Sequence, residues 1–362
     1  MRLQRLGLKN YRNCENISLE FVKQKTLIIG KNAQGKTNIL ESIYLLSDLK
    51  SPRTSTMADL IKFNSNQFEI NAEIEKNNTQ IELDISYSQD KKRELKTNKV
   101  KTSAKDFRLA VKTVLFSTKD LLLLRGAPQD RRVWLDRAIS QIYPAYDERL
   151  SKYEKIRIQK NNLLKSEYID EALLDVYNEQ IIIKGANIIF LRKKFLKEIE
   201  KLASEKHKVI SDTEEFTLDY TCPKDEIEEI SEYLRQELRN RRSEEFGRRQ
   251  ACVGPHRDDI EFKINGIDAV KFASQGQQRT LVLALKLGEL EIIKTKTGYS
   301  PILLLDDVLA ELDESRQNFL LKSIENGIQT IITSVDTILF EEDFLKDVQI
   351  YTIENGRLKV NQ

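Results

Sequence analysis

Eight residues near the N-terminus have the types and spacing of a phosphate-binding loop. They match the pattern G-x-x-x-x-G-K-[ST] and are Gly30, Lys31, Asn32, Ala33, Gln34, Gly35, Lys36 and Thr37. The two glycines let the backbone curl so that its N–H groups surround phosphates, while Lys36 reaches the terminal phosphates and the Thr37 hydroxyl ligates Mg²⁺. A simple glycine turn is the alternative. The position directly after the apolar run 26–29 and before a helix predicted at about 37–47 disfavours it.

A pair of carboxylates follows the apolar strand predicted at 302–305. Asp306 fits an outer or water-mediated contact to Mg²⁺, and Asp307 is placed to orient or deprotonate an attacking water. The alternative is a buried strand that merely ends in solvated aspartates. The phosphate-loop pattern elsewhere in the chain makes the chemical interpretation the stronger one.

A third group of candidates, Ser274, Gly276 and Gln277, precedes a long apolar helix. A serine at a helix N-cap with a glycine two residues later presents a hydroxyl, backbone amides and the positive helix end to an anion. Ordinary helix capping explains the serine equally well. What favours a functional role is its position 32 residues before Asp306.

The pattern of apolar residues indicates which elements position these groups. Short apolar runs predict strands up to residue 29, and period-2 alternation around the polar turn 76–79 predicts an antiparallel hairpin over 67–86. Lys/Glu-rich segments with helical spacing occupy about 130–240. After about residue 250, strands again alternate with helices, which predicts a mostly parallel sheet covered on both faces.

We therefore predict an α/β protein with two domains. Residues 1–105 plus 246–362 form a discontinuous head with a mixed sheet that carries the phosphate loop and an antiparallel N-terminal sheet. Residues 106–245 form a mainly helical insertion. The chain of 362 residues is long enough to build both around hydrophobic cores.

Composition excludes several classes of protein. No stretch has the roughly 18 uncharged apolar residues of a membrane span, and the first residues lack the apolar core of a secretion signal, so we expect a soluble, cytoplasmic protein. Three widely separated cysteines and two histidines disfavour a disulfide framework or a structural zinc site. The net charge of +2 indicates that any nucleic-acid surface must come from local charge segregation.

Local segregation of charge occurs in residues 91–108, which hold eight basic and two acidic side chains. Candidate contacts to a DNA backbone are Lys91, Lys92, Arg93, Lys96, Lys99, Lys101 and Lys105. A second, weaker set is Arg239, Arg241, Arg242, Arg248 and Arg249. A solvated face is the alternative for both. No motif for sequence-specific recognition is present, so binding would be independent of sequence.

The order of these motifs resembles the ATP-binding-cassette superfamily. Its plan is a phosphate loop, a Ser-x-Gly-Gln-type signature, a strand closed by two acids, the segment 310–313 and a further strand at 330–334. The 238 residues from Lys36 to Ser274 are more than transport ATPases have, and resemble the split-head branch that includes the SMC proteins. One departure is that Asp307 stands where most cassette ATPases carry Glu, from which we predict slow hydrolysis.

Over essentially its whole length the chain is similar to the RecF family of bacterial recombination and repair ATPases. The segments that carry this resemblance are LKNYRN at 8–13, the loop at 30–38, SPRT at 51–54, LFSTKDL at 115–121, RRVWLD at 131–136, GPHRDD at 254–259, SQGQQR at 274–279 and LDDV at 305–308. The resemblance implies a cassette-type ATPase head with two lobes and a helical second domain. The signature of one subunit would complete the nucleotide site of another.

The resemblance also implies activity, cofactors and partners. The expected function is recombinational repair and replication-fork restart: ATP with Mg²⁺ closes a homodimer on duplex DNA or single-strand/duplex junctions, slow hydrolysis opens it, and recombinase is loaded at gaps with RecR and RecO. It adds Asn38 and Arg12 to the nucleotide-binding residues, and suggests that Arg53 contacts phosphate. The catalytic set is Asp307, Lys36 and Ser274, with Thr37 and Asp306 at the metal.

Two further pairs of residues are candidates for roles in phosphate sensing or in structure. Thr333 and Ser334 occupy the place of a γ-phosphate sensor, which is usually a histidine, and His256 with Arg257 is expected to be structural or to join lobes. Three other functions stay open: a P-loop enzyme such as a small-molecule kinase, a transport ATPase subunit, and an ATP-gated scaffold with a partner other than DNA. ATP turnover by a monomer would favour the first of these.

Overall fold

The computed structural model describes residues 1–211, 213–324 and 327–359, in two compact units. Unit 1 comprises Met1–Asp120 and Lys286–Gln362, and unit 2 comprises Leu121–Leu285. Both boundaries differ from those predicted. Residues 106–120 lie in unit 1 because the strand they contain pairs with the strand that ends at Asp306. Residues 246–285 lie in unit 2 because they complete a small sheet there. The division of the chain into these two domains stays a prediction.

The first sheet of unit 1 is antiparallel and has the strand order β2-β1-β4-β5-β6-β7. Its strands are β1 (Arg2–Tyr11), β2 (Cys14–Glu20), β4 (Gln67–Lys76), β5 (Thr79–Ser88), β6 (Lys92–Thr97) and β7 (Val100–Lys101). β4 and β5 pair in register from Gln67↔Ser88 to Lys76↔Thr79, which confirms the predicted hairpin. Alternate side chains face the core, as expected for a sheet that is solvated on one side.

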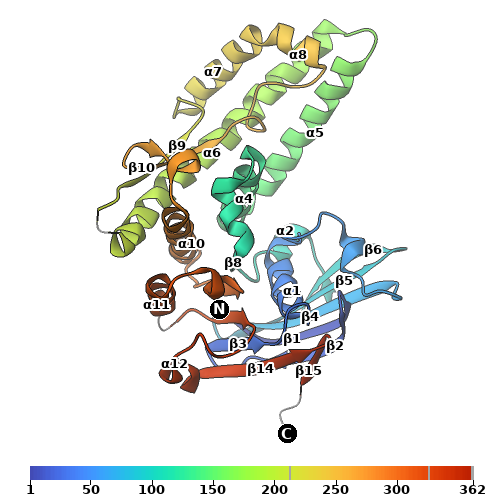
Figure 1. The fold of residues 1–362 in the computed structure, drawn as a ribbon. Helices are drawn as coiled ribbons and strands as arrows, with labels where there is room; N and C mark the ends of the chain where they lie inside the picture. Colours follow the sequence, from blue (N-terminus) through green and yellow to red (C-terminus); the bar gives the residue numbers. More distant parts are fainter. Residues whose placement is uncertain (212, 325–326, 360–362) are drawn as a thin grey trace. The chain divides into compact units, whose positions relative to one another are not determined.

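The second sheet of unit 1 is mixed, with the order β15-β14-β3-β13-β12-β8 (Figure 1). Its strands are β3 (Lys25–Ile29), β8 (Thr113–Ser117), β12 (Ile302–Asp306), β13 (Thr330–Ser334), β14 (Val348–Glu354) and β15 (Arg357–Lys359). All neighbours are parallel except β14 and β15. The carboxyl ends of β3, β13 and β12 therefore meet at one edge, where the phosphate loop and both acids lie.

The helix α1 (Lys36–Asp48) shares the core of unit 1 with both sheets. Ile39, Ile43 and Leu46 recur at helical spacing on its buried face. The other short helices in the Met1–Asp120 and Lys286–Gln362 segments are η1 (Met57–Leu60), α2 (Ala104–Phe107), η2 (Thr118–Leu121), η3 (Val308–Glu311), α11 (Glu314–Ser323) and α12 (Glu342–Lys346). The two kinds of sheet, the loop between β3 and α1, and the helical unit 2 confirm the predicted fold class.

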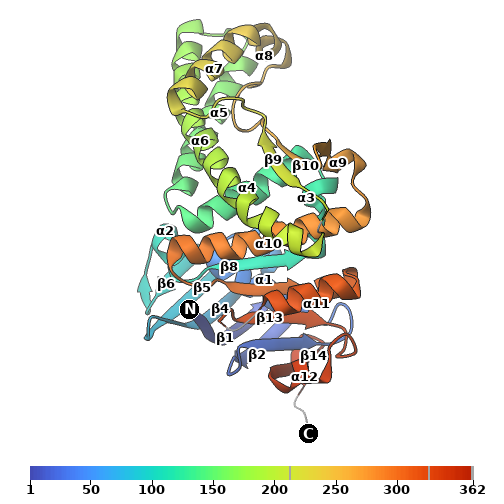
Figure 2. The same ribbon diagram turned by 90° about the vertical axis from the view of Figure 1, so that its left-hand side faces the viewer.

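Unit 2 is mainly helical (Figure 2). Its helices are α3 (Leu122–Arg125), α4 (Pro128–Ile142), α5 (Tyr146–Lys165), α6 (Glu171–Ile210), α7 (Ile227–Asn240), α8 (Arg242–Arg248) and α9 (Ala269–Phe272). The 40-residue α6 packs against both α5 and α7. Helix α10 (Gln275–Thr297) begins in unit 2, and the division between the units falls within it.

A three-stranded sheet in unit 2 joins segments far apart in the sequence. β9 (Phe216–Tyr220) pairs with β10 (Ile260–Ile264), which turns through Asn265 and Gly266 into β11 (Ile267–Asp268). β11 leads directly to α9 and then to Ser274. Among the described residues, no helix combines the length and apolar character needed to cross a membrane.

Candidate nucleotide site

The loop between β3 and α1 depends on its two glycines for its path. A Cβ at Gly30 would lie 2.4 Å from the carbonyl oxygen of Ile353, which is backbone and cannot move aside. Gly35 has a φ of +113°, and a Cβ there would lie 2.7 Å from Asn13 Oδ1. The loop is thus closely packed on the outside, and its backbone turns toward a pocket on the inside.

The basic residue of the motif lies over the loop. Lys36 Nζ donates hydrogen bonds to the carbonyl oxygens of Gly30, at 2.6 Å, and Lys31, at 3.3 Å, and the side chain is buried. These contacts hold the ammonium group at the concave side of the loop. A phosphate cradled by the loop amides would meet this charge first.

The loop and the acid pair meet through a single hydrogen bond. Thr37 Oγ1 donates to Asp306 Oδ1 at 2.8 Å, although the two residues are 269 positions apart. Burial raises the pKa of Asp306, and the hydrogen bonds from Thr37 and Thr333 act against this rise. The hydroxyl and carboxylate oxygens are the hard donors that Mg²⁺ prefers, and a Mg²⁺ site needs only one or two such groups besides phosphates and water. The pair therefore fits Mg²⁺.

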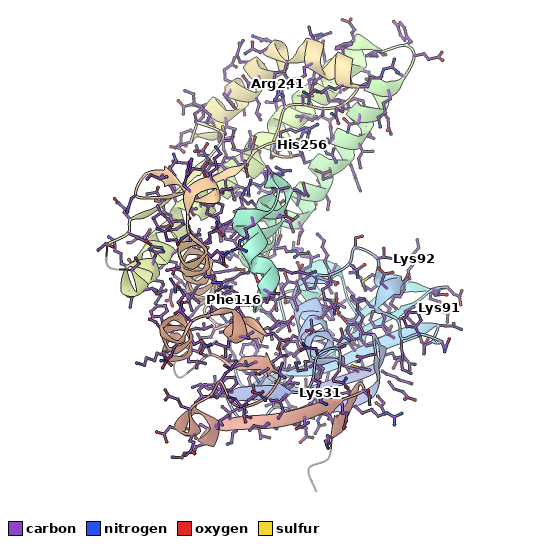
Figure 3. The ribbon with its side chains drawn as sticks, viewed as in Figure 1. Lys31, Lys91, Lys92, Phe116, Arg241 and His256 are labelled. Carbon is purple, nitrogen blue, oxygen red and sulfur yellow. The ribbon has the colours of Figure 1, made fainter. Side chains whose placement is uncertain are left out.

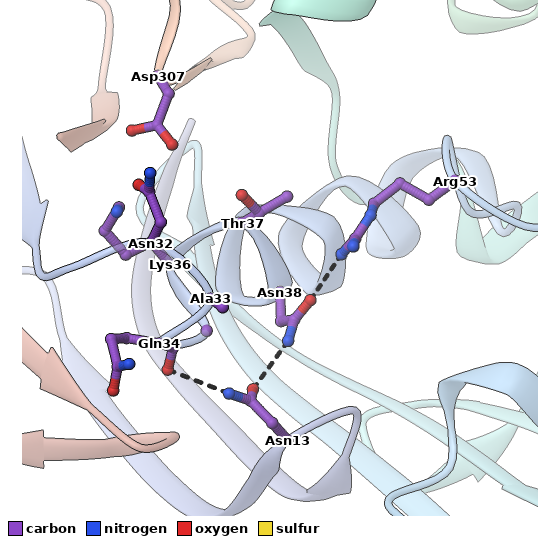
Figure 4. A pocket seen from close by; sticks show the side chains of 10 residues that line it. Asn13, Asn32, Ala33, Gln34, Lys36, Thr37, Asn38, Arg53 and Asp307 are labelled. Carbon is purple, nitrogen blue, oxygen red and sulfur yellow. Dashed lines mark hydrogen bonds between the residues drawn. The ribbon is translucent and has the colours of Figure 1, made fainter. Parts of the chain in front are cut away.

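A pocket of about 470 Å³ opens beside this pair (Figure 4). Its lining residues are Asn13, Asn32, Ala33, Gln34, Gly35, Lys36, Thr37, Asn38, Arg53 and Asp307. Asp307 lies across the pocket from the loop, and the side chains of Asn32 and Lys36 point toward Asp307. The structure thus brings the loop residues 32–38 together with Asp307, although the two motifs are far apart in the sequence.

Comparisons with known proteins agree with this geometry. Residues 2–359 match the model of the RecF/RecN/SMC N-terminal domain family. The chain is 40% identical to "DNA replication and repair protein RecF" of Natranaerobius thermophilus, covering 100% of this chain and 99% of that one. It is 42% identical to the protein of the same name from Streptococcus gordonii, covering 99% and 100%. The chain belongs to the RecF family.

Solved structures show the same relationship. A structure of the recombination mediator protein RecF with ATP, described as part of the RecFOR pathway, matches with a TM-score of 0.91 at 34% identity and covers 99% of this chain and 97% of that one. A structure of an SMC head bound to a domain of ScpA matches with a TM-score of 0.57 at 15% identity, which shows a shared fold. The predicted resemblance to the RecF family is confirmed.

Arg12 lies outside the pocket, although the RecF resemblance suggested it as a nucleotide contact. Its guanidinium donates two hydrogen bonds to the buried Glu41, at 2.7 and 2.9 Å, and a third to the Asp59 carbonyl oxygen. Arg53, in contrast, lines the pocket and donates to Asn38 Oδ1 at 2.7 Å. A phosphate contact by Arg12 stays a prediction.

Asn13 is a site residue that sequence reasoning missed. Its Oδ1 accepts a hydrogen bond from Asn38 Nδ2 at 2.8 Å, and its Nδ2 donates to the Gln34 carbonyl oxygen at 3.1 Å (Figure 4). Gln34 is also held by the turn between β14 and β15, where Asn355 N donates to its Oε1 and Gly356 N to its carbonyl oxygen. The only available signal was the place of Asn13 within the RecF-like segment 8–13.

The signature residues lie in unit 2 at the start of α10. Ser274 Oγ accepts a hydrogen bond from Gln277 N, and Gln277 Oε1 accepts one from Ser274 N, at 3.2 and 2.7 Å. This reciprocal pair is a capping box. Ser274 is exposed and Gly276 partly so, and Gln277 Nε2 also donates to Glu214 at 2.8 Å. Their contact with a nucleotide of a second subunit stays a prediction.

The basic run 91–108 does not form one patch. Lys91 and Lys92 lie at the end of the β5–β6 hairpin (Figure 3), and neither forms an ion pair within the described ranges. Lys96 and Lys99 lie beside carboxylates, 3.6 Å from Glu94 and Glu82 respectively. Arg93 is on the face of β6 opposite to that of Lys96 and donates to the Leu49 carbonyl oxygen. Lys101 and Lys105 are exposed further along the chain.

Most arginines of the second basic set are also paired. Arg241 and Arg248 contact Glu244, and Arg242 contacts Glu171, at distances of 2.7 to 3.1 Å. Pairing with acids reduces the positive field that a polyanion would experience. Lys91, Lys92, Lys101 and Lys105 are thus the exposed lysines of the run for which no ion pair is found among the described residues.

His256 lies in a buried network within unit 2 (Figure 3). Its Nδ1 accepts a hydrogen bond from the Tyr153 hydroxyl at 2.6 Å, and its Nε2 donates to the Ala251 carbonyl oxygen at 3.1 Å. Burial, together with nearby arginines, lowers the pKa of His256 to about 3, although the hydrogen bond to the Ala251 carbonyl oxygen acts in the opposite sense. The neutral ring is part of the packing of unit 2.

The GPHRDD segment is held by a buried arginine. Arg192 of α6 donates to both oxygens of Asp136, each at 2.9 Å, and to the Pro255 carbonyl oxygen at 2.6 Å. Tyr220 donates to Asp258 Oδ2, and burial raises the pKa of Asp258 to about 6. These contacts join α4, α6 and β9 to the strand that leads to the signature.

Proposed function

We propose that this chain is an ATP-dependent DNA-binding protein of recombinational repair and replication-fork restart, and a slow, DNA-stimulated ATPase. The observation that carries the proposal is the 2.8 Å hydrogen bond between Thr37 and Asp306, which joins the phosphate loop to the acid pair beside a pocket of nucleotide size. Support also comes from relatives that are named DNA replication and repair proteins and from a related structure that holds ATP.

Each side chain has a role in this scheme. The loop amides and Lys36 bind the phosphates, and Thr37 with Asp306 would hold Mg²⁺, which supplies charge neutralisation on the phosphate oxygens. Asp307, facing the loop across the pocket, orients the attacking water and accepts its proton. The shorter side chain of Asp, compared with Glu, holds this water less closely, which makes hydrolysis slow and suits a timed switch.

ATP binding would close a homodimer. In this scheme the nucleotide held by Lys36 of one copy meets Ser274, Gly276 and Gln277 of the other. Two modest DNA surfaces then act together, so that the avidity of the dimer exceeds the affinity of either copy. The closed dimer holds duplex DNA or a single-strand/duplex junction, and with RecR and RecO it promotes recombinase loading at gaps.

Sedimentation velocity of the full chain with fluorescent duplex DNA tests the proposal. The chain is run at fixed salt without nucleotide, with ADP, and with a slowly hydrolysed ATP analogue. We expect a DNA-bound dimer only with the ATP analogue. ATP turnover by a monomer that ignores DNA would instead support a small-substrate P-loop enzyme, and DNA binding indifferent to nucleotide without detectable hydrolysis would support a scaffold.

Two substitutions separate closure from opening. Asp307→Asn removes the proposed base and is expected to prolong the ATP-bound dimer, whereas Ser274→Arg places a bulky side chain at the signature and is expected to prevent it. Ser243→Arg, on the exposed side of α8 in the same unit, is the matched control and should dimerise like the wild type. Equal dimerisation by the Asp307 and Ser274 variants would contradict the scheme.

A further inference from the structure

A buried threonine lies between the two strands that carry the chemistry. Thr333 is near the carboxyl end of β13, which has β3 on one side and β12 on the other. It pairs in register with Asp306 of β12 and with Ile28 of β3. Its side chain is 1% exposed, so its hydroxyl must find its partners within the protein.

The Thr333 hydroxyl makes one contact to each acidic residue. Its Oγ1 donates to Asp306 Oδ1 at 3.1 Å, with the Leu305 carbonyl oxygen a longer alternative at 3.4 Å. The same oxygen accepts a hydrogen bond from the backbone N–H of Asp307 at 2.9 Å. One hydroxyl therefore links the carboxylate that contacts Thr37 to the backbone of the carboxylate that faces the loop.

The backbone at Asp307 needs such support. Its φ is +51° and its ψ is 17°, a left-handed conformation that a residue with a Cβ adopts at some cost. Because the Asp307 N–H is fixed to Thr333, the turn is held where β12 ends. This turn directs the Asp307 side chain toward the pocket, which Asp307 lines.

We propose that Thr333 is a positioning residue that sets the geometry of the acid pair relative to the phosphate loop. This assignment rests on the proposed ATPase function and replaces the γ-phosphate sensor expected at this position. A sensor must reach the phosphate, but Thr333 is not among the residues that line the pocket, and its hydroxyl is already used on both acids.

The experiment compares Thr333→Val, which keeps the shape but removes the hydroxyl, with Thr333→Ser, which keeps the hydroxyl. Steady-state hydrolysis with saturating DNA gives kcat and KM for ATP, and a fluorescent ATP analogue gives the Kd without Mg²⁺. For Thr333→Val we expect kcat to fall by roughly tenfold to a hundredfold, because a buried N–H loses its acceptor and the acid pair shifts. The Kd without Mg²⁺ should stay within about threefold of the wild-type value.

The serine variant and a second valine variant serve as controls. Thr333→Ser should keep kcat within about threefold of the wild-type value. Thr330→Val removes a hydroxyl from the same strand, where Thr330 Oγ1 donates to the Ile328 carbonyl oxygen at 3.3 Å rather than to an acid, and should leave kcat unchanged. If Thr333→Val does not fold, Thr333→Ala replaces it, and the serine variant decides independently.

Each outcome has one meaning. A Thr333→Val protein with the wild-type kcat, or a Thr333→Ser protein as deficient as the valine variant, overturns the positioning role. A parallel loss of kcat in Thr330→Val would show that the effect is general destabilisation of β13. If the wild type itself neither binds nor hydrolyses ATP, the proposed function fails, and this result is distinct from the failure of the Thr333 assignment.

Discussion

Asn13 lies where two other chain segments meet the phosphate loop. Its carboxamide contacts Asn38 of α1 and the Gln34 carbonyl oxygen, and its own carbonyl oxygen packs against Gly356 in the turn between β14 and β15. A glycine-rich loop has many accessible conformations, so external hydrogen bonds are needed to hold its N–H groups in a phosphate-binding arrangement. Asn13 is thus expected to lower the entropic cost of binding nucleotide.

Asn13→Ala is therefore expected to weaken ATP binding. The loss of two hydrogen bonds of about 1 kcal/mol each predicts a roughly thirtyfold increase in the Kd of a fluorescent ATP analogue. Asn16→Ala, an exposed position on β2, is the matched control and should bind like the wild type. Unchanged binding by the Asn13 variant would mean that the loop holds its shape without this contact.

At the residue scale, the sequence predicts conformations that depend on local residues, but it does not predict contacts that depend on distant packing. The motif 30–37 predicts the loop after β3 and the start of α1, because its conformation depends on its own glycines. Arg12 and Asn13 are adjacent, but Arg12 contacts Glu41 while Asn13 contacts the loop. This division depends on where α1 packs, and nothing in the segment 8–13 encodes that position.

The hairpin formed by β14 and β15 is an element that supports the site from outside the motifs. Its turn is formed by Asn355 and Gly356, with φ values of +50° and +71°, and both backbone N–H groups donate to Gln34. A similar Asn-Gly turn, with Gly266 at φ +75°, joins β10 and β11 in unit 2. The two turns share their conformation but differ in what surrounds them.

Replacing each turn glycine with alanine measures this difference. A Cβ at Gly356 would lie 2.3 Å from the Asn13 carbonyl oxygen, whereas a Cβ at Gly266 meets nothing within 4 Å. We expect Gly266→Ala to cost about 1 kcal/mol of unfolding free energy, the conformational penalty alone, and Gly356→Ala to cost more and also to weaken ATP binding. Urea unfolding and the analogue Kd give both quantities. Equal costs would show that the Asn13 contact does not constrain the turn.

The buried network of unit 2 predicts a dependence of stability on pH. The pKa of His256 is lowered from 6.5 to about 3 by burial, with Arg157, Arg257 and Arg132 nearby. Between about pH 6.5 and 3, His256 is therefore protonated in the unfolded chain and neutral in the folded chain. Above pH 6.5 the histidine is neutral in both states and does not reduce the free energy of unfolding. As the pH falls from 6.5 toward 3, the unfolded chain binds this proton and the free energy of unfolding decreases progressively. Asp258, whose pKa is raised to about 6, contributes in the opposite sense, so a variant comparison is needed.

His256→Gln isolates the contribution of the histidine. Glutamine keeps a donor for the Ala251 carbonyl oxygen but does not titrate. We expect the urea midpoint of the wild type to fall more steeply than that of the variant between pH 6.5 and 4, and the two curves to run parallel above pH 7.5. Parallel curves over the whole range would mean that the His256 pKa is close to its ordinary value.

Element prediction was reliable where the pattern is local and incomplete where pairing is distant. The hairpin 67–86 and the strand–loop–helix at 25–48 follow from period, turn residues and the glycine motif. The pairing of β9 with β10 joins residues 216–220 to 260–264. Because of this pairing, the segment 246–285 belongs to unit 2 and not to the predicted head. Alternating apolar residues identify each strand, but they do not name its partner.

At the scale of the whole molecule, charge is balanced rather than segregated. The net charge is +2, and several of the predicted DNA contacts lie next to carboxylates, such as Lys96 beside Glu94 and Lys99 beside Glu82. Counting charges along the run 91–108 includes Glu94 but misses Glu82, which the neighbouring strand β5 supplies. Binding of a polyanion would then rely on the cations that have no acidic neighbour, and the proposed dimer would double their number.

A pair of double charge reversals tests this distribution with the overall charge held equal. Lys91→Glu with Lys92→Glu, and Lys96→Glu with Lys99→Glu, each change the net charge by the same amount. Each phosphate contact contributes about 0.9 to the slope of log K against log salt, so the first pair should reduce this slope by about 2 for each copy of the chain. The second pair should change it less, since Glu94 and Glu82 already neutralise these lysines. DNA binding of the ATP-analogue complex over a salt series gives both slopes. Equal slopes would show that only the total charge matters, and that the end of the β5–β6 hairpin is a solvated surface.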